Sequence, residues 1–240
     1  MMLGARMAAW AKSGYTAKDY IQDGLVAMWD GIENAGWGVH DQNATTWKDL
    51  SGNGHALLLS GTALFGADHA ELDGSGFFYK STDISPFFAK TGLTAQVVST
   101  KIDAGENEGL YSIGLSTRFL WIWNSFQQGG GEMTFSKFVY SHNVGSTFPN
   151  IARDAKTSFT ITHANGIANT FVNKTADRTV SVSPLSVSGT DRIAIGRIQN
   201  FQNFEGNIYC VRHYSRALTD EEIAHNYEID KARFGIGDEA

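Results

Sequence analysis

The sequence predicts an all-β fold, a sandwich or a barrel, with one helix near the C-terminus. Many short apolar runs are separated by turn residues, a spacing typical of these architectures. The 240 residues include 26 glycines and only 3 prolines, which fits tight turns between strands better than a low-complexity linker. Hydrophobic residues make up 42% and charged residues 18%, which excludes a disordered chain. The length fits one domain with a short appendage.

The expected strands are apolar runs bounded by turn residues. The clearest local signal is Asn165-Gly166, because this dipeptide supplies the positive φ angles that a tight hairpin needs. Pro86 predicts a turn or a single helical turn. In chain order, the expected strands are 25–29, 56–59, 71–74, 77–79, 93–102, 109–115, 118–124, 132–140, 158–163, 167–173, 179–182, 191–195 and 206–214.

One helix is expected, over residues 219–234. Thr219 and Glu222 fit a capping box, with Thr219 as N-cap. Ile223 begins an apolar face at helical spacing, and Gly235 can end the helix.

Residues 1–20 are expected to form a short N-terminal arm or helix, and residues 21–240 the domain. The arm either stays mobile or orders against a neighbouring subunit, since its Ala, Met and Trp residues gain from burial. The apolar run at 7–11 is shorter than the roughly 7–15 residues of a signal peptide. No run approaches the ~20 residues of a membrane span. We therefore expect cytoplasmic synthesis without a signal peptide, no membrane insertion, and any export by another route, such as particle assembly or lysis.

Charge and cysteine content exclude several classes of function. The net charge is −6 and the isoelectric point about 5.6, so no basic excess is available to neutralise nucleic-acid phosphates. An acidic protein is also poorly suited to anionic membranes. Cys210 is the single cysteine, which excludes an internal disulfide and a Cys-rich zinc site. We expect Cys210 to be a small core residue.

Three segments carry a family resemblance. The opening GLVAMWDG…TTWKDLSGNGHALLL and the ending FEGNIYCVRHYSRALTDEEIAHNYEIDKARFG resemble those of a laminin G-like domain of the concanavalin A-like lectin/glucanase superfamily. The segment FTITHANGIANTFVN is similar to the family's hairpin that usually ends in Tyr-Val-Asn-Gly, although Lys174 replaces the final glycine here. The resemblance covers residues 24–234. It implies a jelly roll of two antiparallel sheets, one of them concave, as found in secreted bacterial proteins and in phage and prophage structural proteins.

The superfamily includes glucanases, whose chemistry needs two carboxylates on either side of the scissile bond. Glu106 and Glu108 alternate, but they lie in a segment that reads as an exposed turn. Glu228 and Asp230 lie on the expected helix. We interpret both pairs as solvated charges, and we expect no enzyme.

Other catalytic chemistries have equally little support. The sequence contains no nucleophile elbow, no His-Glu-x-x-His and no phosphate loop. The seven histidines are scattered without metal-ligand spacing. His213 and His225 are the pair that the last strand and the helix could bring together.

The run from Arg118 to Asn124 is a candidate sugar platform. Strand alternation places Phe119, Trp121 and Trp123 on one face and Leu120 with Ile122 on the other. If the leucine and isoleucine enter the core, the three aromatic residues line the other sheet surface. The opposite arrangement, with the aromatic residues in the core, remains open.

The loop 34–41 is a second candidate. Glycines on both sides of Trp37 would give an aromatic ring a flexible mount, and His40 and Asp41 follow as polar partners. Loops carry binding residues more often than strands do. The alternative is a loop folded over the core, with Trp37 as its plug.

The resemblance also implies a calcium site, which is common among relatives. Calcium takes carboxylate and carbonyl oxygens, and Asp49, Asn53 and Asp73 are the donors nearest the family motifs. Asp49 and Asn53 equally fit a turn in which they bond their own backbone.

Three functions follow from the residues and the resemblance. The first is a non-catalytic carbohydrate-binding or adhesion module, displayed on a phage virion or another surface. The second is a structural or decoration subunit of a virion that binds neighbouring subunits through residues 1–20. The third is a glycan-active enzyme with an unusual site. We favour the first and expect no cofactor other than calcium. A homotrimer would suit a fibre and a monomer would suit a decoration.

Overall fold

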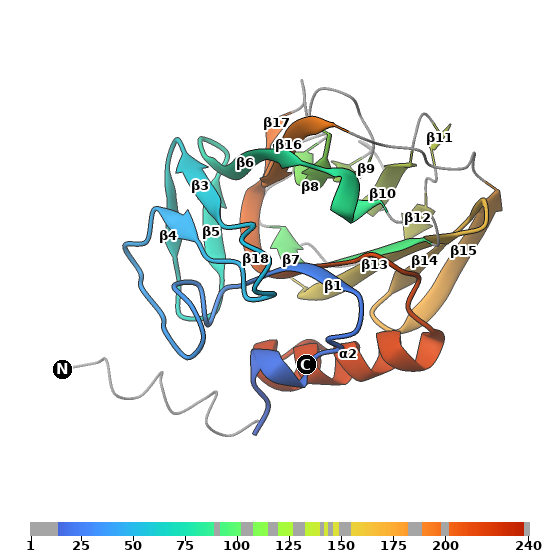
Figure 1. Cartoon of the computed structure of the whole chain (residues 1–240), viewed down its shortest axis with the longest axis horizontal. Coiled ribbons are helices and arrows are strands. Elements are labelled where there is room, and N and C mark those ends of the chain that lie inside the picture. The colour runs from blue at the N-terminus through green and yellow to red at the C-terminus, as the bar shows by residue number, and fades with distance from the viewer. Residues whose placement is uncertain are drawn as a thin grey trace.

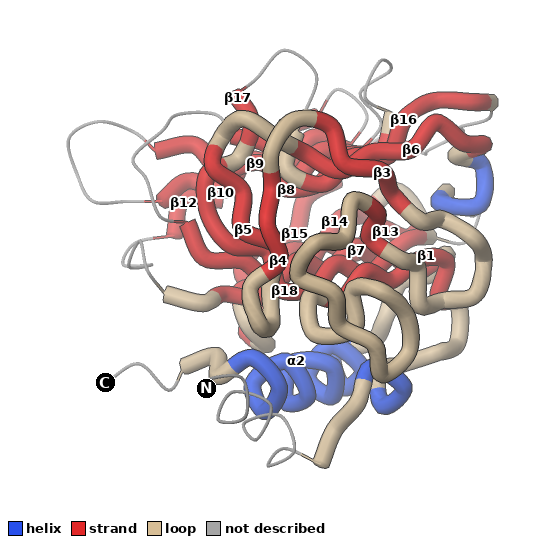
Figure 2. The backbone as a smooth tube through the Cα atoms, turned by 90° about the vertical axis from the view of Figure 1, so that its left-hand side faces the viewer, coloured by secondary structure: helices blue, strands red, loops and turns tan. Residues whose placement is uncertain are grey.

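The computed structural model describes residues 14–88, 92–101, 108–114, 120–126, 133–139, 142–143, 146–148, 155–181, 189–197 and 202–237. These residues form three layers. A ten-stranded sheet packs on an eight-stranded sheet, and helix α2 (Asp220–Phe234) lies on the far side of the eight-stranded sheet (Figure 1). The view turned by 90° shows the same order, with α2 below the strands (Figure 2). The predicted two-sheet, jelly-roll-like sandwich with one C-terminal helix is therefore confirmed.

The eight-stranded sheet carries the helix. Its order among the described residues is β15-β14-β13-β7-β18-β5-β4, and β1 also pairs with β18. Its strands are β1 (Leu25–Asp30), β4 (Ala63–Phe65), β5 (Ala70–Asp73), β7 (Leu93–Lys101), β13 (Thr157–Ala164), β14 (Ile167–Val172), β15 (Thr175–Ser181) and β18 (Glu205–Tyr214).

The ten-stranded sheet forms the other layer. Its order is β11-β10-β9-β8-β16-β6-β3-β2, with β12 beside β10 and β17 parallel to β8. The strands of this sheet are β2 (Thr46–Trp47), β3 (Leu57–Ser60), β6 (Phe77–Asp83), β8 (Glu108–Ile113), β9 (Leu120–Phe126), β10 (Met133–Val139), β11 (His142–Asn143), β12 (Ser146–Phe148), β16 (Thr190–Ile195) and β17 (Gln202–Asn203). Two short 3-10 helices, η1 (Ala17–Asp19) and η2 (Ser85–Phe87), complete the described elements.

The main core lies between the two sheets. Trp29 and Trp47 have no exposed surface, and the ring of Trp47 packs edge-on against Phe65 and Phe78. Both indole N–H groups are satisfied inside: Trp29 donates to the carbonyl of His55 and Trp47 to that of Asp30. Buried indoles need such partners, so these two residues fix how β1 and the following loop meet the sheets.

Strand β18 serves two cores because it contains a bulge. Its register with β7 shifts between Ile208 and Cys210. Ile208 and Val211 belong to the cluster between the sheets, while Cys210 belongs to the cluster under α2. The extra residue of a bulge reverses the alternation of side chains, so Arg212 also lies on the helix side. Cys210 is 1% exposed, which confirms it as a core residue.

The two strongest local predictions are confirmed. Asn165 and Gly166 have φ angles of 52° and 75° in the turn between β13 and β14. Thr219 caps α2 by accepting a hydrogen bond from the Glu222 amide, Glu222 reaches back to the N-cap, and Gly235 ends the helix with φ 71°. Each motif satisfies backbone groups that the helix end or turn would leave unpaired.

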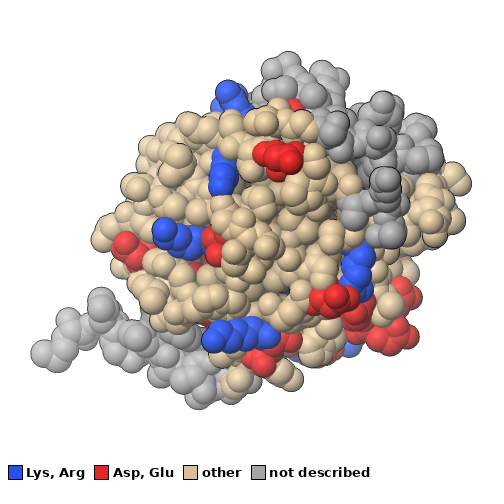
Figure 3. Space-filling model, viewed as in Figure 1, with Lys and Arg blue, Asp and Glu red and all other residues tan. Residues whose placement is uncertain are grey.

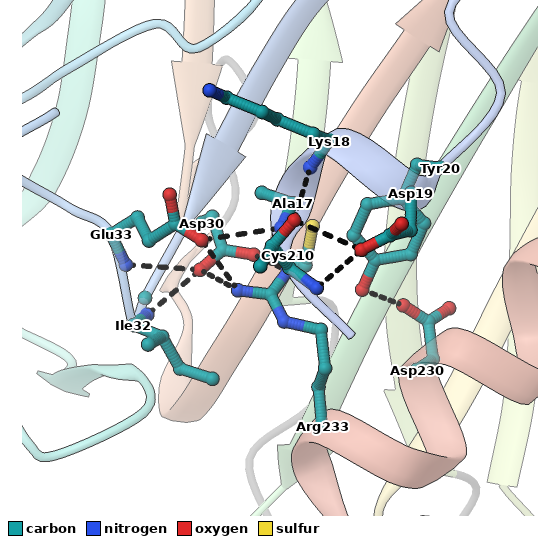
Figure 4. A network of polar contacts seen from close by, with 12 residues as sticks. Ala17, Lys18, Asp19, Tyr20, Asp30, Ile32, Glu33, Cys210, Asp230 and Arg233 are labelled. Carbon is teal, nitrogen blue, oxygen red and sulfur yellow. Dashed lines mark hydrogen bonds and ion pairs between the residues drawn. The ribbon is translucent and has the colours of Figure 1, made fainter. Parts of the chain in front are cut away.

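Buried ion pairs hold α2 on the sheet (Figure 4). The guanidinium of Arg212 on β18 donates two hydrogen bonds of 2.6 Å to the carboxylate of Asp230 on α2. Arg233 of α2 pairs with Asp30 at 2.7 Å and with Glu33 at 3.2 Å. The exposed fractions of these side chains are between 0% and 7%. Burial of an ion is costly unless it is paired. These charges are paired only when α2 is packed against the sheet.

The segment before β1 packs into the same network (Figure 4). The Tyr20 hydroxyl donates to Asp230 at 2.8 Å, and the Tyr20 ring lies 4.0 Å from the Arg212 guanidinium. The Ala17 amide donates to the Glu33 carboxylate at 3.2 Å. Ala17 and Tyr20 are 0% and 1% exposed. Part of the predicted arm, residues 14–20, thus lies against the domain of its own chain, whereas residues 1–13 are outside the described residues.

Candidate functional site

The outer face of the ten-stranded sheet, on the side away from α2, carries an aromatic pair. On β6, Phe78 lies in the core between the sheets, so its neighbours Phe77 and Tyr79 face outward. Their ring centroids are 5.5 Å apart. Leu58 of β3 pairs with Tyr79 and is 56% exposed. Apolar surface is therefore available beside the rings.

Two arginines lie over these rings. The guanidinium carbon of Arg197 is 4.7 Å from the centroid of Phe77, and that of Arg192 is 6.0 Å from the centroid of Tyr79. Arg192 is exposed and Arg197 is half-buried. The Ser112 hydroxyl donates to the Arg197 carbonyl at 3.0 Å, which fixes the main chain at that point. We call Leu58, Phe77, Tyr79, Arg192 and Arg197 the outer-face cluster.

The strand register connects this cluster to the tryptophans of β9. One row of paired Cα positions runs Leu58, Tyr79, Ala194, Ser112 and Trp121. Three strand-to-strand steps separate Tyr79 from Trp121, which is roughly 14 Å. In the neighbouring pairs, the backbone positions of Leu120 and Ile122 are opposite the core residues Ile113 and Tyr111.

The predicted sugar platform is described only in part. Phe119 lies outside the described residues, and for Trp121 and Trp123 only the backbone of β9 is described. Trp123 pairs with Gly109 on one side and Ser136 on the other. The choice between core and platform therefore stays a prediction, made on the register alone.

The Trp37 loop, residues 33–41, presents its aromatic residue to solvent. Trp37 is 41% exposed and Val39 is 52% exposed, so Trp37 is not a plug of the core. The Lys18 ammonium lies 5.3 Å from the centre of the Trp37 ring. The exposed tip and the segment before β1 therefore form one continuous surface.

Hydrogen bonds brace the loop that carries Trp37, and the flexibility that its two glycines suggested stays a prediction. The Glu33 carboxylate accepts the Gly38 amide at 2.9 Å. The Asn34 side chain bonds both backbone groups of Asp41, at 2.7 and 2.9 Å. The His40 ring nitrogen Nδ1 lies 3.1 Å from two backbone carbonyls, so it must donate. The His40 ring and the Asp41 backbone thus support the loop, and their predicted role as ligand contacts stays a prediction.

The calcium candidates are engaged in turns. The Asp49 carboxylate accepts four hydrogen bonds, from the amides of Met28, Ser51 and His55 and from the Ser51 hydroxyl. The Asn53 amide donates to carbonyls at the start of β1, and Asp73 caps the turn at Ser75. Within the ranges that the structure describes, no three Asp, Glu, His or Cys side chains are grouped as a metal site requires. These contacts are those of the turn interpretation.

Two interpretations of the acidic residues as solvated charges are wrong. Glu108 is 2% exposed at the start of β8 and accepts the Glu205 amide at 3.1 Å. Asp230 is fully buried because Arg212 neutralises it. Glu228, by contrast, is 51% exposed and pairs with Lys174. Glu106 lies outside the described residues.

The histidine pair on the last strand and helix does not form. His213 faces the core between the sheets, where its ring lies 2.7 Å from the Phe87 carbonyl and 3.3 Å from the Tyr111 hydroxyl. Burial lowers the pKa of His213 to about 4. His225 is exposed on α2 and contacts the Asp19 carbonyl. The eight-stranded sheet separates the two rings.

The outer-face cluster was missed in the sequence. Phe77 and Tyr79 were read only as a strand, and Arg192 only as part of another. The alternation Phe77-Phe78-Tyr79 could have signalled aromatic residues on both faces of one strand. No local pattern could have paired them with arginines so far along the chain.

The family model described as the concanavalin A-like lectin/glucanases superfamily, laminin G-like, matches residues 91–224. None of the curated protein sequences matches significantly. No helix within the described ranges is both long and apolar enough to cross a membrane.

Solved structures share the fold at low sequence identity. Domain 4 of a GH43 extracellular arabinanase from Geobacillus stearothermophilus, in complex with arabinotriose, has a TM-score of 0.62 and 17% identity over 83% of this chain and 96% of that one. The Trypanosoma rangeli sialidase in complex with sialic acid has a TM-score of 0.67 and 12% identity, over 94% of this chain and 38% of that one. The botulinum neurotoxin DC binding domain, in complex with rat synaptotagmin II, has a TM-score of 0.62 and 12% identity, over 86% of this chain and 52% of that one. This chain therefore spans only part of the sialidase and neurotoxin chains.

Proposed function

Because the chain belongs to the concanavalin A-like lectin/glucanase superfamily, we propose that it is a non-catalytic carbohydrate-binding module whose ligand lies on the outer face of the ten-stranded sheet. The observation that carries this proposal is the outer-face cluster. It places an aromatic pair, an exposed leucine and two guanidiniums on one face of a sheet. Sugar rings offer apolar C–H patches and hydroxyl groups, and such a surface answers both, since it has apolar area and hydrogen-bond donors.

The strand register places the backbone of Trp121 in line with this surface. The backbone of Trp121 occupies the same row as Leu58 and Tyr79. Residues directly opposite each other in antiparallel strands share a face. Ala194 and Ser112, which lie between Tyr79 and Trp121 in this row, have no exposed surface, so the proposed ligand surface is the part around Leu58 and Tyr79. The arabinanase domain and the sialidase were solved with bound carbohydrates. Because only the fold is shared with this chain, the fold is the only support that they give to this proposal.

The test is binding of the full chain to a glycan array, with and without calcium. We expect binding that a Tyr79→Ala variant loses while its unfolding midpoint stays close to that of the wild type. The matched control is Tyr15→Ala, because Tyr15 is 43% exposed outside the cluster. Retained binding in Tyr79→Ala, or equal loss in both variants, would contradict the proposed site. Calcium dependence would contradict the turn interpretation of Asp49.

A second candidate, an assembly subunit on a virion or other surface, has one observation in its favour. Trp37 and Val39 form an exposed apolar tip beside the segment that precedes β1. Exposed apolar residues on a loop braced by hydrogen bonds suit a protein partner. The test is deletion of residues 1–13 only, since Ala17 and Tyr20 are buried in the domain. Unchanged incorporation into the assembly, by this deletion and by Trp37→Ala, would contradict this candidate.

A further inference from the structure

The arrangement of the arginines in the outer-face cluster indicates what kind of glycan it would take. The guanidinium of Arg197 lies over the face of Phe77, and Phe77 is only 9% exposed. The Arg197 guanidinium therefore covers the Phe77 ring and separates it from solvent. A neutral sugar that needs a bare ring for stacking would have to displace the guanidinium. At this point of the surface, a ligand would therefore meet a positively charged guanidinium and not an aromatic ring.

The stacked geometry leaves hydrogen-bond donors available. A guanidinium has five N–H groups in its own plane, and stacking on an aromatic ring uses the face of that plane rather than its edge. The Nε of Arg197 is buried without a hydrogen-bond partner among the described residues, so a ligand would meet the terminal N–H groups of this side chain rather than Nε. Neither Arg192 nor Arg197 forms an ion pair with any acidic group in the described part of the chain. Among the described residues, both guanidiniums therefore lack a carboxylate partner.

This lack is not general in the protein, which has 25 acidic residues against 19 lysines and arginines. Arg212 and Arg233 are each matched by buried carboxylates. Arg216, on the surface, pairs with Asp23 and Glu222. In the view of Figure 3, most red acidic side chains lie in the lower half, at the level of α2. Within the described residues, carboxylates thus pair with the three arginines beside the helix, and none forms an ion pair with Arg192 or Arg197.

From these contacts we infer that the outer-face cluster binds an acidic oligosaccharide through carboxylate groups on its sugars; this rests on the proposed function. A carboxylate matches the planar fork of a guanidinium with two parallel hydrogen bonds, and such charge-assisted pairs are the strongest in proteins. The guanidiniums of Arg192 and Arg197 lie over neighbouring rings whose centroids are 5.5 Å apart. Both cations are therefore placed to meet the carboxylates of one oligosaccharide.

The test compares ligands that differ only in charge. The probes are oligogalacturonate, oligoalginate and sialyllactose, each with its neutral methyl ester, and sulfated carrageenan oligosaccharides. We expect binding to one or more of the carboxylated probes, at least about 10-fold weaker binding to its ester, and weakening as salt rises from 50 to 500 mM. Arg192→Gln and Arg197→Gln should each weaken binding about 10-fold or more. Arg192→Lys keeps the charge but lacks the planar fork, so it should bind more weakly than the wild type.

The control variant is Arg178→Gln, which removes the same charge from β15 in the other sheet. It should bind as the wild type does, and all variants are checked for unchanged unfolding midpoints. Equal binding of acid and ester would overturn the inference and leave the proposed function standing. Binding to the sulfated probes alone would also overturn the carboxylate assignment. Absence of binding to every probe here and to the broad array would overturn the proposed function, and the inference with it.

Discussion

Replacement of Asp230 by asparagine is the sharpest test of the network that holds α2. The substitution keeps the shape and removes one charge. The Asp230 carboxylate accepts two hydrogen bonds of 2.6 Å from Arg212 and one of 2.8 Å from Tyr20, and neither Arg212 nor Asp230 has exposed surface. In Asp230→Asn, the Arg212 cation would stay buried without its anion. Loss of one partner of a buried pair costs about 3–5 kcal/mol.

This magnitude is a large part of the roughly 5–15 kcal/mol that stabilises a domain. The assay is urea unfolding followed by tryptophan fluorescence, since Trp29 and Trp47 are fully buried. The matched control is Glu228→Gln, on the same helix but in an exposed pair with Lys174. It should leave the unfolding midpoint unchanged, because exposed ion pairs contribute little. A loss below about 1 kcal/mol in Asp230→Asn would refute the reasoning.

A double variant separates charge from packing. Arg212→Met with Asp230→Leu removes both ions, so no buried charge is left alone. The side-chain oxygen Oε1 of Gln96, which accepts a hydrogen bond from Arg212 Nε, keeps its second hydrogen bond from Asn226. Replacement of a buried pair by apolar residues is often neutral, so the double variant should be more stable than Asp230→Asn by at least about 2 kcal/mol. Additivity of the two single changes within about 0.5 kcal/mol would show that the charges do not couple.

Three further predictions concern separate features. Burial lowers the pKa of His213 to about 4, so the unfolded chain takes up a proton that the folded chain refuses. The free energy of unfolding should therefore fall by up to about 3 kcal/mol as pH drops from about 6.5 to 4. His213→Gln should flatten this dependence in unfolding curves at pH 7.5 and 4.5, and an equal slope would contradict the assignment. Gly166→Ala should cost about 1 kcal/mol because φ is +75°, measured as a shift in the urea midpoint; no shift would exclude strain. Trp37→Ala should leave the thermal midpoint unchanged, since the ring is 41% exposed; a clear drop would show that the ring stabilises the loop.

The elements predicted from the sequence are those with local causes. The turn at Asn165-Gly166 and the caps of α2 depend on residues at most a few positions apart, and the structure has them as expected. Strands β2, β11 and β17 have two residues each, too few for an alternating pattern to appear. They exist because neighbouring strands supply hydrogen bonds, which is a tertiary cause.

The network and the outer-face cluster could not be predicted because their partners are distant in the sequence. Asp30 and Arg233 are 203 positions apart. The burial of Arg212 depends on the bulge between Ile208 and Cys210, which leaves no local signal in the sequence. Exposed and buried charges look alike until the register is known, and this is why Asp230 was interpreted as solvated.

The network and the outer-face cluster lie on opposite sides of the sandwich, with both sheets between them (Figure 1). Sites this far apart, without shared partners, contribute independently. Variants beside α2 should therefore change the unfolding midpoint and leave glycan affinity unchanged while the domain is folded. Variants at Arg192 should do the reverse, because its guanidinium stabilises no buried acid. If Asp230→Asn weakened ligand binding under conditions where it is folded, the two faces would be coupled through the sheets. The geometry of the ligand surface would then depend on the packing of α2 on the other side of the sandwich.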